Sequence, residues 1–292
     1  MFSYEAIPGF FAQDDPLADA ASIGAVSPFA SPFVPARFGL LDSSSQRWST
    51  LLSRLRALNA ASGATGTVYK LFFFGRHGQG YHNVAEDKYG TKAWDDYWAM
   101  LNGDGELTWG PDPELTALGL AQATVASNMW KSELRDAQIP RPDSFFCSPL
   151  TRAMQTAVTT FWGTFNDVRI LVVENCREEH GEHTCDKRST RTQIESTFSI
   201  IREDELRFEF EPGFTETDTI WLPDVRETKP QATERAKGVL DRIFLENSEA
   251  LFISITAHSG IINAFLHAMG RARYALPTGG VLPVVVRATK VN

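Results

Sequence analysis

Leu71-Phe72-Phe73-Phe74-Gly75-Arg76-His77-Gly78 is the stretch that decides the fold, because an almost wholly apolar run ends there in Arg-His-Gly. A short, continuously apolar run is typical of a strand buried on both faces of a parallel sheet. A second such run, residues 251–257, ends at His258-Ser259-Gly260. Ligands bind at the carboxyl ends of neighbouring parallel strands. The sequence therefore predicts two imidazoles, with Arg76 beside the first, at one ligand-binding edge.

Predicted strands and helices alternate along the rest of the chain. Apolar or β-branched runs predict strands over 68–74, 144–147, 168–173, 251–256 and 281–286, the last broken by Pro283. Apolar residues at helical spacing predict helices over 46–58, 114–137, 149–162, 231–246 and 261–269. This alternation predicts an α/β fold, a three-layer α/β/α sandwich around a central, mostly parallel sheet.

The composition is that of an acidic globular protein. Of 292 residues, 43% are hydrophobic, and the formal net charge is −8 with a pI near 5.3. Because binding to nucleic acid needs clustered Lys and Arg, this charge argues against a nucleic-acid partner. No apolar run approaches the roughly 18 residues of a membrane span, and no Lys or Arg of a signal peptide precedes Arg37. Three cysteines are too few for a secreted disulfide framework, so we expect a cytoplasmic protein.

The chain divides into two parts of different composition. Residues 1–60 start with a stretch rich in Pro, Ala, Ser and Phe, which we interpret as an extended arm that packs on the core. Its aromatic residues include Phe10, Phe11, Phe29, Phe33 and Phe38. Residues 61–292 form the main predicted domain, with irregular insertions at about 81–113 and 184–229. Both insertions follow predicted strand ends, where substrate-selecting loops lie.

A third strand end supplies a second arginine. Ser148-Pro149-Leu150-Thr151-Arg152 follows the strand predicted over 144–147 and places Arg152 in the first turn of a helix. Amides at a helix N-terminus favour an anion, and the guanidiniums of Arg76 and Arg152 suit the oxygens of a phosphate. Taken alone, Arg76-His77-Gly78 is equally consistent with a structural histidine. The three strand ends together indicate phosphate chemistry.

Five motifs follow one another along the chain. They are Arg76-His77-Gly78-Gln79-Gly80-Tyr81-His82-Asn83, Asp112-Pro113-Glu114-Leu115-Thr116-Ala117-Leu118-Gly119, Ser148-Pro149-Leu150-Thr151-Arg152-Ala153-Met154-Gln155-Thr156-Ala157, Cys176-Arg177-Glu178-Glu179 and Ala257-His258-Ser259-Gly260. In type and order they resemble the motifs of the histidine phosphatase superfamily, in its phosphoglycerate-mutase-like branch. The resemblance covers about residues 66–290 and implies that family's fold for the domain over 61–292.

The resemblance also implies a reaction and its residues. His77 would attack phosphorus to form a phosphohistidine, and Glu178 would give a proton to the leaving oxygen, with His258 as the third catalytic residue. The implied phosphate-binding residues are Arg76, Asn83, Arg152 and His258. Phosphoryl transfer mainly needs such positioning and charge neutralisation. The implied substrate is a small phosphorylated molecule, and no cofactor or metal is implied.

The proton donor stays open at this point. Glu174, Glu179 and Glu182 lie within a few residues of Glu178, and a loop could bring any of the four to the site. Glu178 is the one in register with the family motif. The role requires a raised pKa, which a shielded crevice supplies.

Three other interpretations compete with a histidine phosphatase. Ser259 after a strand resembles a hydrolase nucleophile, but the flanking glycines of G-x-S-x-G are absent and only His267 follows it. The loop 179–185 contains His180, His183 and Cys185, without the ligand spacing of a zinc motif. A catalytically silent relative that binds a phospho-ligand is a third alternative, although no residue of the matched set is substituted.

The reaction class is predicted to be hydrolysis of a phosphate monoester, with a phosphoglycerate-type mutase as the alternative. In the mutase relatives an Arg-x-Tyr-Gly stretch follows the acid. Here Glu178 is followed by Glu179-His180-Gly181-Glu182-His183, so that Arg and that Tyr are absent. The two acids of that segment would repel the carboxylate of a phosphoglycerate.

Overall fold

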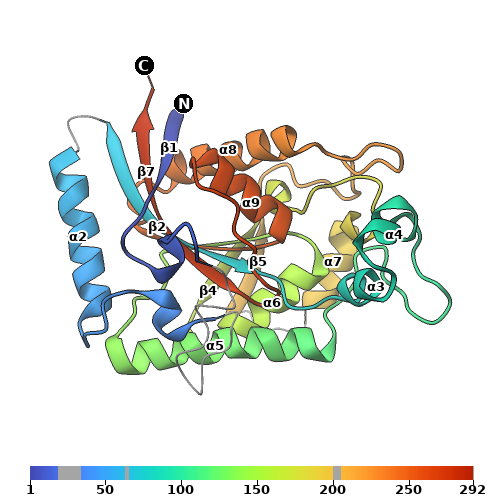
Figure 1. Ribbon diagram of the computed structural model, residues 1–292, viewed down its shortest axis with the longest axis horizontal. Helices are drawn as coiled ribbons and strands as arrows, with labels where there is room; N and C mark the ends of the chain where they lie inside the picture. The colour runs from blue at the N-terminus through green and yellow to red at the C-terminus, as the bar shows by residue number, and fades with distance from the viewer. Residues whose placement is uncertain (19–33, 63–65, 200–204, 292) are drawn as a thin grey trace.

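One seven-stranded sheet organises the molecule (Figure 1). The computed structural model describes residues 1–18, 34–62, 66–199 and 205–291. The strands are β1 (Phe2–Ile7), β2 (Thr67–Arg76), β3 (Ser144–Cys147), β4 (Val168–Val172), β5 (Leu206–Phe210), β6 (Phe252–Ala257) and β7 (Val281–Lys290). They lie in the order β1-β7-β2-β6-β3-β4-β5. The pairs from β2 through β6, β3 and β4 to β5 are parallel, while β7 is antiparallel to both β1 and β2. The predicted α/β sandwich with a mostly parallel sheet is confirmed.

Helices cover both faces of the sheet (Figure 1). The longer helices are α2 (Arg47–Ser62), α5 (Ala117–Ala137), α6 (Thr151–Phe161), α8 (Lys229–Glu246) and α9 (Ser259–Ala268). Helices α2, α5 and α6 share one hydrophobic cluster with one face of the sheet, and α8 and α9 share a second cluster with the other face. Strand β2 divides its side chains between the two, with Leu71 and Phe73 in the first cluster and Phe72 and Phe74 in the second. Burial on both faces explains why this strand is apolar without interruption.

Both edges of the sheet differ from the prediction. Strand β1 pairs with β7 inside the segment expected to be an extended arm, and β5 pairs with β4 inside the insertion predicted over 184–229. Pro283 does not break the last strand, since β7 continues to Lys290. Pro283 lies opposite Phe73 of β2, beyond the end of β1. Among the described residues no strand pairs with the other side of that part of β7, so the missing N–H of proline is tolerated.

The first 60 residues contribute to the core as well as to the sheet edge. Phe10, Phe11 and Phe38 are buried in the same cluster as α2, while Phe29 and Phe33 lie outside the described residues. Trp48 of α2 is fully buried and donates its indole N–H to Glu133 of α5 at 2.7 Å. A short 3-10 turn, η3 (Ala36–Gly39), brings Phe38 against Trp130, with ring centroids 4.7 Å apart.

The two predicted insertions meet above the carboxyl edge. The first holds α3 (Tyr81–Tyr89), α4 (Thr91–Asp96) and η5 (Trp98–Met100), and the second holds η7 (Thr184–Asp186) and α7 (Arg191–Phe198). A third hydrophobic cluster joins them, made of Ala85, Trp94, Ala99, Trp109 and Cys185. Its tryptophans pack against each other, with Trp94 and Trp109 3% and 0% exposed. The segments that contain α3, α4, η5, η7 and α7 therefore pack into one layer above the carboxyl edge of the sheet, which we call the roof.

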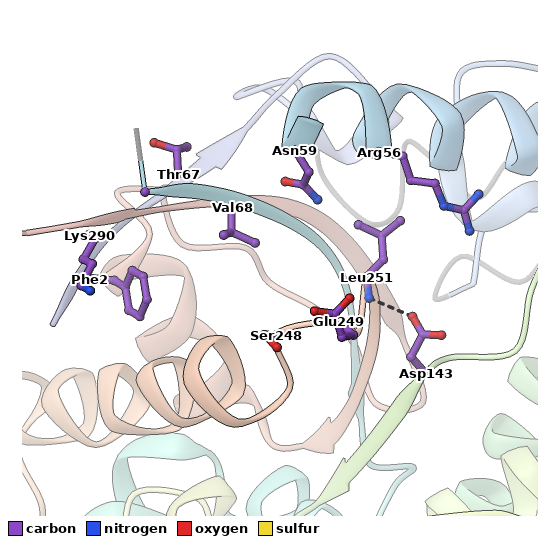
Figure 2. Close-up of a pocket in the computed structure, with 11 residues that line it drawn as sticks. Phe2, Arg56, Asn59, Thr67, Val68, Asp143, Ser248, Glu249, Leu251 and Lys290 are labelled. Atoms are coloured by element: carbon purple, nitrogen blue, oxygen red, sulfur yellow. Dashed lines mark hydrogen bonds between the residues drawn. The ribbon is translucent and has the colours of Figure 1, made fainter. Parts of the chain in front are cut away.

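A cavity of about 610 Å³ opens at the opposite, amino end of the strands (Figure 2). Thr67 and Val68 at the start of β2 line it, together with Asp143 and Leu251, which precede β3 and β6. Asp143 accepts the backbone N–H of Leu251 at 2.8 Å. None of its lining residues belongs to the five motifs, and the strand ends that carry His77 and His258 lie at the other end of the sheet.

Candidate active site

His77 follows β2 and makes three contacts with backbone groups. Its N–H donates to the carbonyl of Ala257 on β6, at 3.0 Å, and its own carbonyl accepts from Gly279, at 2.9 Å. The ring Nδ1 lies 2.6 Å from the carbonyl oxygen of Gly78. Because a carbonyl only accepts, Nδ1 carries the hydrogen and the lone pair is on Nε2. His77 is 2% exposed.

His258 lies beside His77, as the sequence predicted. It is the N-cap of α9, directly after β6, and the centroids of the two rings are 4.9 Å apart. The parallel pairing of β2 with β6 places Arg76 opposite Ala257, so the residues that follow both strands are neighbours. His258 Nε2 lies 2.7 Å from the Ser148 hydroxyl oxygen, and Nδ1 is buried without a partner.

Arg152 is in the first turn of α6, where the sequence placed it, and is 1% exposed. Its Nη1 donates to the carbonyl of Cys185 at 2.6 Å, and its Nη2 donates to Asp186 Oδ1 at 2.8 Å. Its Nε is buried without a partner. The guanidinium is thus anchored through its two terminal nitrogens by the roof, and its Nε–H has no partner among the described residues.

Arg76 directly precedes His77, and Asn83 lies in the first turn of α3, one residue after His82. The last residue of β2, Arg76, donates from Nη1 to the carbonyl of Leu276 at 2.8 Å, while its buried Nε has no partner. Asn83 accepts the backbone N–H of Gly80 through Oδ1, at 3.0 Å, which caps the start of α3. The amide nitrogen of Asn83 is the group that could donate to a phosphate oxygen.

Glu178 is set apart from the three other carboxylates of its loop. Its Oε2 accepts the N–H of Gly260 at 2.9 Å, and its Oε1 accepts that of Ile261 at 3.1 Å, so it sits on the first turn of α9, next to His258. Glu174 pairs with Arg177 and Arg188, and Glu179 pairs with Lys229 at 2.5 Å. Glu182 has its backbone N–H bound to the carbonyl of Leu222.

His82 was quoted in the first motif but given no role, and the structure brings it to the site. It lies in the first turn of α3, its ring centroid is 5.3 Å from that of His77, and it is 8% exposed. Its Nδ1 is buried without a partner. A Cβ on Gly80 would lie 2.7 Å from that atom, so the glycine admits the ring. The spacing of five residues from His77 carried no signal, because α3 was not predicted.

Burial and charge set the protonation states. Burial, followed by the charges of Arg152 and Arg76, lowers the pKa of His77 well below its ordinary value, and the pKa values of His82 and His258 are lowered in the same way. The pKa of Glu178 is raised, first by burial and then by the negative charge of Asp186, although the hydrogen bond from the Gly260 amide acts to lower it. The cluster therefore combines neutral imidazoles with a carboxyl group that retains its proton to higher pH.

The metal interpretation of the loop 179–185 meets an obstacle in its surroundings. His183, Cys185 and Asp186 have donor atoms within 4.8 Å of one another. However, Asp186 already accepts from two guanidiniums, those of Arg152 and Arg226. Burial raises the pKa of the Cys185 thiol well above its ordinary range. Two fixed cations and a protonated thiol oppose the binding of a metal ion.

The serine-hydrolase interpretation fails on geometry. Ser259 begins α9, and His267 lies near the end of the same helix, eight residues later. At about 1.5 Å per residue, the two are roughly 12 Å apart along the axis. They are too far apart for a hydrogen bond between nucleophile and base.

Comparison with known proteins shows which family the chain is similar to. The family model of the histidine phosphatase superfamily (branch 1) matches residues 72–278. The chain is 39% identical, over 98% of its length and 84% of the relative, to a protein of Arthroderma benhamiae named "Probable phosphoglycerate mutase". It is 33% identical to "Phosphomutase-like protein 3" of Candida albicans, over 99% of this chain and 81% of that one. A mycobacterial glucosyl-3-phosphoglycerate phosphatase solved with vanadate is 18% identical, covers 76% of this chain and 99% of its own, and has a TM-score of 0.45.

The fold and the site define an α/β protein with three buried imidazoles and two guanidiniums at the carboxyl edge of its sheet. The chain belongs to the histidine phosphatase superfamily. Within the part of the chain that the structure describes, no helix is long and apolar enough to cross a bilayer.

Proposed function

We propose that this protein hydrolyses a phosphate monoester, without a metal, through a phosphohistidine on His77. The observation that carries the proposal is a set of buried nitrogens around His77 that have no partner among the described residues. They are Arg76 Nε, Arg152 Nε, His82 Nδ1 and His258 Nδ1. Buried polar groups are rarely left unpaired in proteins. Four of them beside one nucleophile suit a bound phosphoryl group.

The first step transfers the phosphoryl group to His77. The lone pair on Nε2 attacks phosphorus, and the bond from phosphorus to the ester oxygen breaks. Glu178 gives its proton to that oxygen, so the alcohol leaves neutral. Arg76 and Arg152 offset the negative charge on the phosphoryl oxygens. The hydrogen bond from Nδ1 to the Gly78 carbonyl holds the ring in the required tautomer.

The second step returns the enzyme to its starting state. Water attacks phosphorus, the bond from Nε2 to phosphorus breaks, and inorganic phosphate leaves. The Glu178 carboxylate accepts the proton lost by the water, so the same residue acts as acid and then as base. Ser148 accepts the N–H of Leu150 and can give its hydroxyl hydrogen to His258 Nε2, which leaves a hydrogen on Nδ1 for the phosphoryl group.

Mutase activity is the second candidate, and the names of two fungal relatives favour it. We prefer hydrolysis because the acid loop lacks the Arg and Tyr that follow the acid in the mutases. Glu179 is neutralised by Lys229, so it repels a substrate carboxylate less than the sequence suggested.

The test measures both products of the phosphohistidine. Wild-type protein is incubated with a panel of sugar, nucleotide and prenyl phosphates, and inorganic phosphate is assayed. In parallel it is incubated with 3-phosphoglycerate and a trace of 2,3-bisphosphoglycerate, and isomerisation is assayed. We expect phosphate release from at least one ester to exceed the mutase rate. A mutase rate above every rate of phosphate release would refute hydrolysis as the function.

A further inference from the structure

Asp186 lies at the centre of a buried charge network that the motifs do not include. It ends the short 3-10 helix η7 and is 3% exposed. Its Oδ1 accepts from Arg152 Nη2 at 2.8 Å, and its Oδ2 accepts from Arg226 Nη1 at 2.9 Å. Its carbonyl oxygen accepts from Arg177 Nη2 at 2.5 Å. Each oxygen of this residue therefore has one guanidinium partner, which fixes the carboxylate in place.

Because the carboxylate is fixed, it also fixes Arg152. The Cys185 carbonyl takes one terminal nitrogen of the Arg152 guanidinium and Asp186 takes the other, while the buried Nε has no partner. The guanidinium is planar and presents its donors in a rigid fork. Anchoring both terminal nitrogens therefore sets the direction of the remaining Nε–H. His77 lies within the electrostatic reach of this guanidinium, since Arg152 is the second-largest cause, after burial, that lowers the pKa of His77.

The negative charge of Asp186 also reaches Glu178. Burial is the largest cause of the raised pKa of Glu178, and Asp186 is the second, ahead of Glu179. Arg76 and Arg226 face Glu178 with the opposite charge, and the N–H groups of Gly260 and Glu179 bind its ionised form. Without Asp186 one cause of the raised pKa would be lost, and these cations and amides would favour the carboxylate more strongly against burial and Glu179.

The carboxylate of Asp186 itself stays ionised. Burial alone would raise its pKa, but Arg226 and Arg152 outweigh burial, and the pKa is lowered. His183 faces it as well, with a pKa lowered by burial, so this imidazole is neutral near pH 7. Asp186 is thus a permanent negative charge in a roof that lies over the site.

We propose that Asp186 is a positioning residue of the reaction: it holds the Arg152 guanidinium so that the Nε–H points at the phosphoryl group. A second role of the same carboxylate, the action of its charge on the proton of Glu178, follows from the position that Arg152 and Arg226 impose on it. The inference rests on the proposed function, because both roles need phosphoryl transfer at His77. It assigns a task to the insertion over 184–229, which contains none of the five motifs.

Two substitutions separate the two roles. Asp186→Asn keeps the shape and an acceptor oxygen but removes the charge. Asp186→Glu keeps the charge and lengthens the side chain by one methylene, which displaces Arg152. The matched control is Asp218→Asn, because Asp218 is also an acid of this insertion, its side chain is 2% exposed and pairs with Arg177, and it is not among the main causes of the raised pKa of Glu178.

The assay follows kcat against pH for p-nitrophenyl phosphate, whose leaving group departs without a proton, and for an alkyl phosphate, which needs one. For Asp186→Asn we expect the alkaline limb of the alkyl profile to move to lower pH. With p-nitrophenyl phosphate that limb should stay in place. For Asp186→Glu we expect rates on both esters to fall about tenfold or more, as misplaced catalytic groups do, with the alkaline limb unmoved. Asp218→Asn should lower the melting temperature and leave both limbs in place.

The outcomes separate this inference from the proposed function. If wild-type protein releases no phosphate in a His77-dependent manner, the function itself is wrong. If it does, and Asp186→Asn has the wild-type alkaline limb on the alkyl ester, Asp186 does not keep the proton on Glu178. Wild-type rates for Asp186→Glu would show that Asp186 does not position Arg152. If Asp186→Asn does not fold, the rates of Asp186→Glu alone decide whether Asp186 is a positioning residue. An equal shift of the limb in Asp218→Asn would reduce Asp186 to a structural residue.

Discussion

Gly260→Ala moves the proposed proton donor without altering any ionisable group. Gly260 lies in the first turn of α9 and donates its N–H to Glu178 Oε2. A Cβ at this position would lie 2.1 Å from Glu178 Oε1, and 2.9 Å from both Glu178 Cδ and Glu179 Oε1, so Glu178 is the more strongly displaced of the two acids. An ordinary contact begins near 3.4 Å. The carboxyl group must therefore move by about 1.3 Å, and a misplacement of roughly 1 Å can cost about 10²-fold in rate.

The expected loss depends on the leaving group. With an alkyl phosphate, which must gain a proton as it leaves, kcat should fall roughly 100-fold. With p-nitrophenyl phosphate it should change little, because His77 and the arginines are untouched. The matched control is Gly238→Ala on α8, where an added Cβ meets nothing within 4 Å. That change should leave both rates unaltered. A Gly260→Ala protein with a normal melting temperature and the wild-type rate on the alkyl ester would refute Glu178 as the donor.

Three further predictions test the electrostatics and the metal. Arg152→Ala and His258→Ala should each raise the activation free energy of phosphoryl transfer by about 3 kcal/mol. The measured result is a lower kcat with a native circular-dichroism spectrum. An Arg152→Ala protein with wild-type activity would contradict a role of Arg152 in binding the phosphoryl group. The free energy of unfolding should fall as the pH drops below about 6.5, because the unfolded chain then protonates His77, His82 and His258 while the folded state, with lowered pKa values, does not. Chemical denaturation at pH 7 and pH 5 measures this loss, which is up to about 1.4 kcal/mol per histidine per pH unit. Equal free energies at the two pH values would refute the lowered pKa values. EDTA should leave phosphate release unchanged, whereas a loss restored by zinc would revive the metal interpretation.

The centre of the fold could be predicted from the sequence, and its edges were missed for a physical reason. Strands buried on both faces are continuous apolar runs, which the predictions over 68–74 and 251–256 found. Strands β1 and β5 are partly exposed, so they alternate apolar and polar residues, as in Leu206-Arg207-Phe208-Glu209-Phe210. That period of two was present in the sequence. It was obscured by the prolines near the first strand and by the charged residues around the second.

The motif residues at the site could be placed because they follow strand ends, and parallel pairing brings strand ends together. His77, Arg152 and His258 needed no further information. His82 and Asp186 could not be assigned, since each reaches the site through an insertion. Their positions depend on how two roof segments pack through Trp94, Trp109 and Cys185, and no local pattern encodes that contact.

The central claim is that His77 carries the phosphoryl group, and trapping that intermediate tests it most directly. Wild-type protein is mixed with a labelled phosphate monoester, quenched within milliseconds in alkali, in which phosphohistidine survives, and digested for mass spectrometry. We expect one phosphorylated histidine, at position 77, and no label in His77→Ala, which should also lack turnover while keeping the native melting temperature. Label on another residue, or substantial turnover by His77→Ala, would contradict the account.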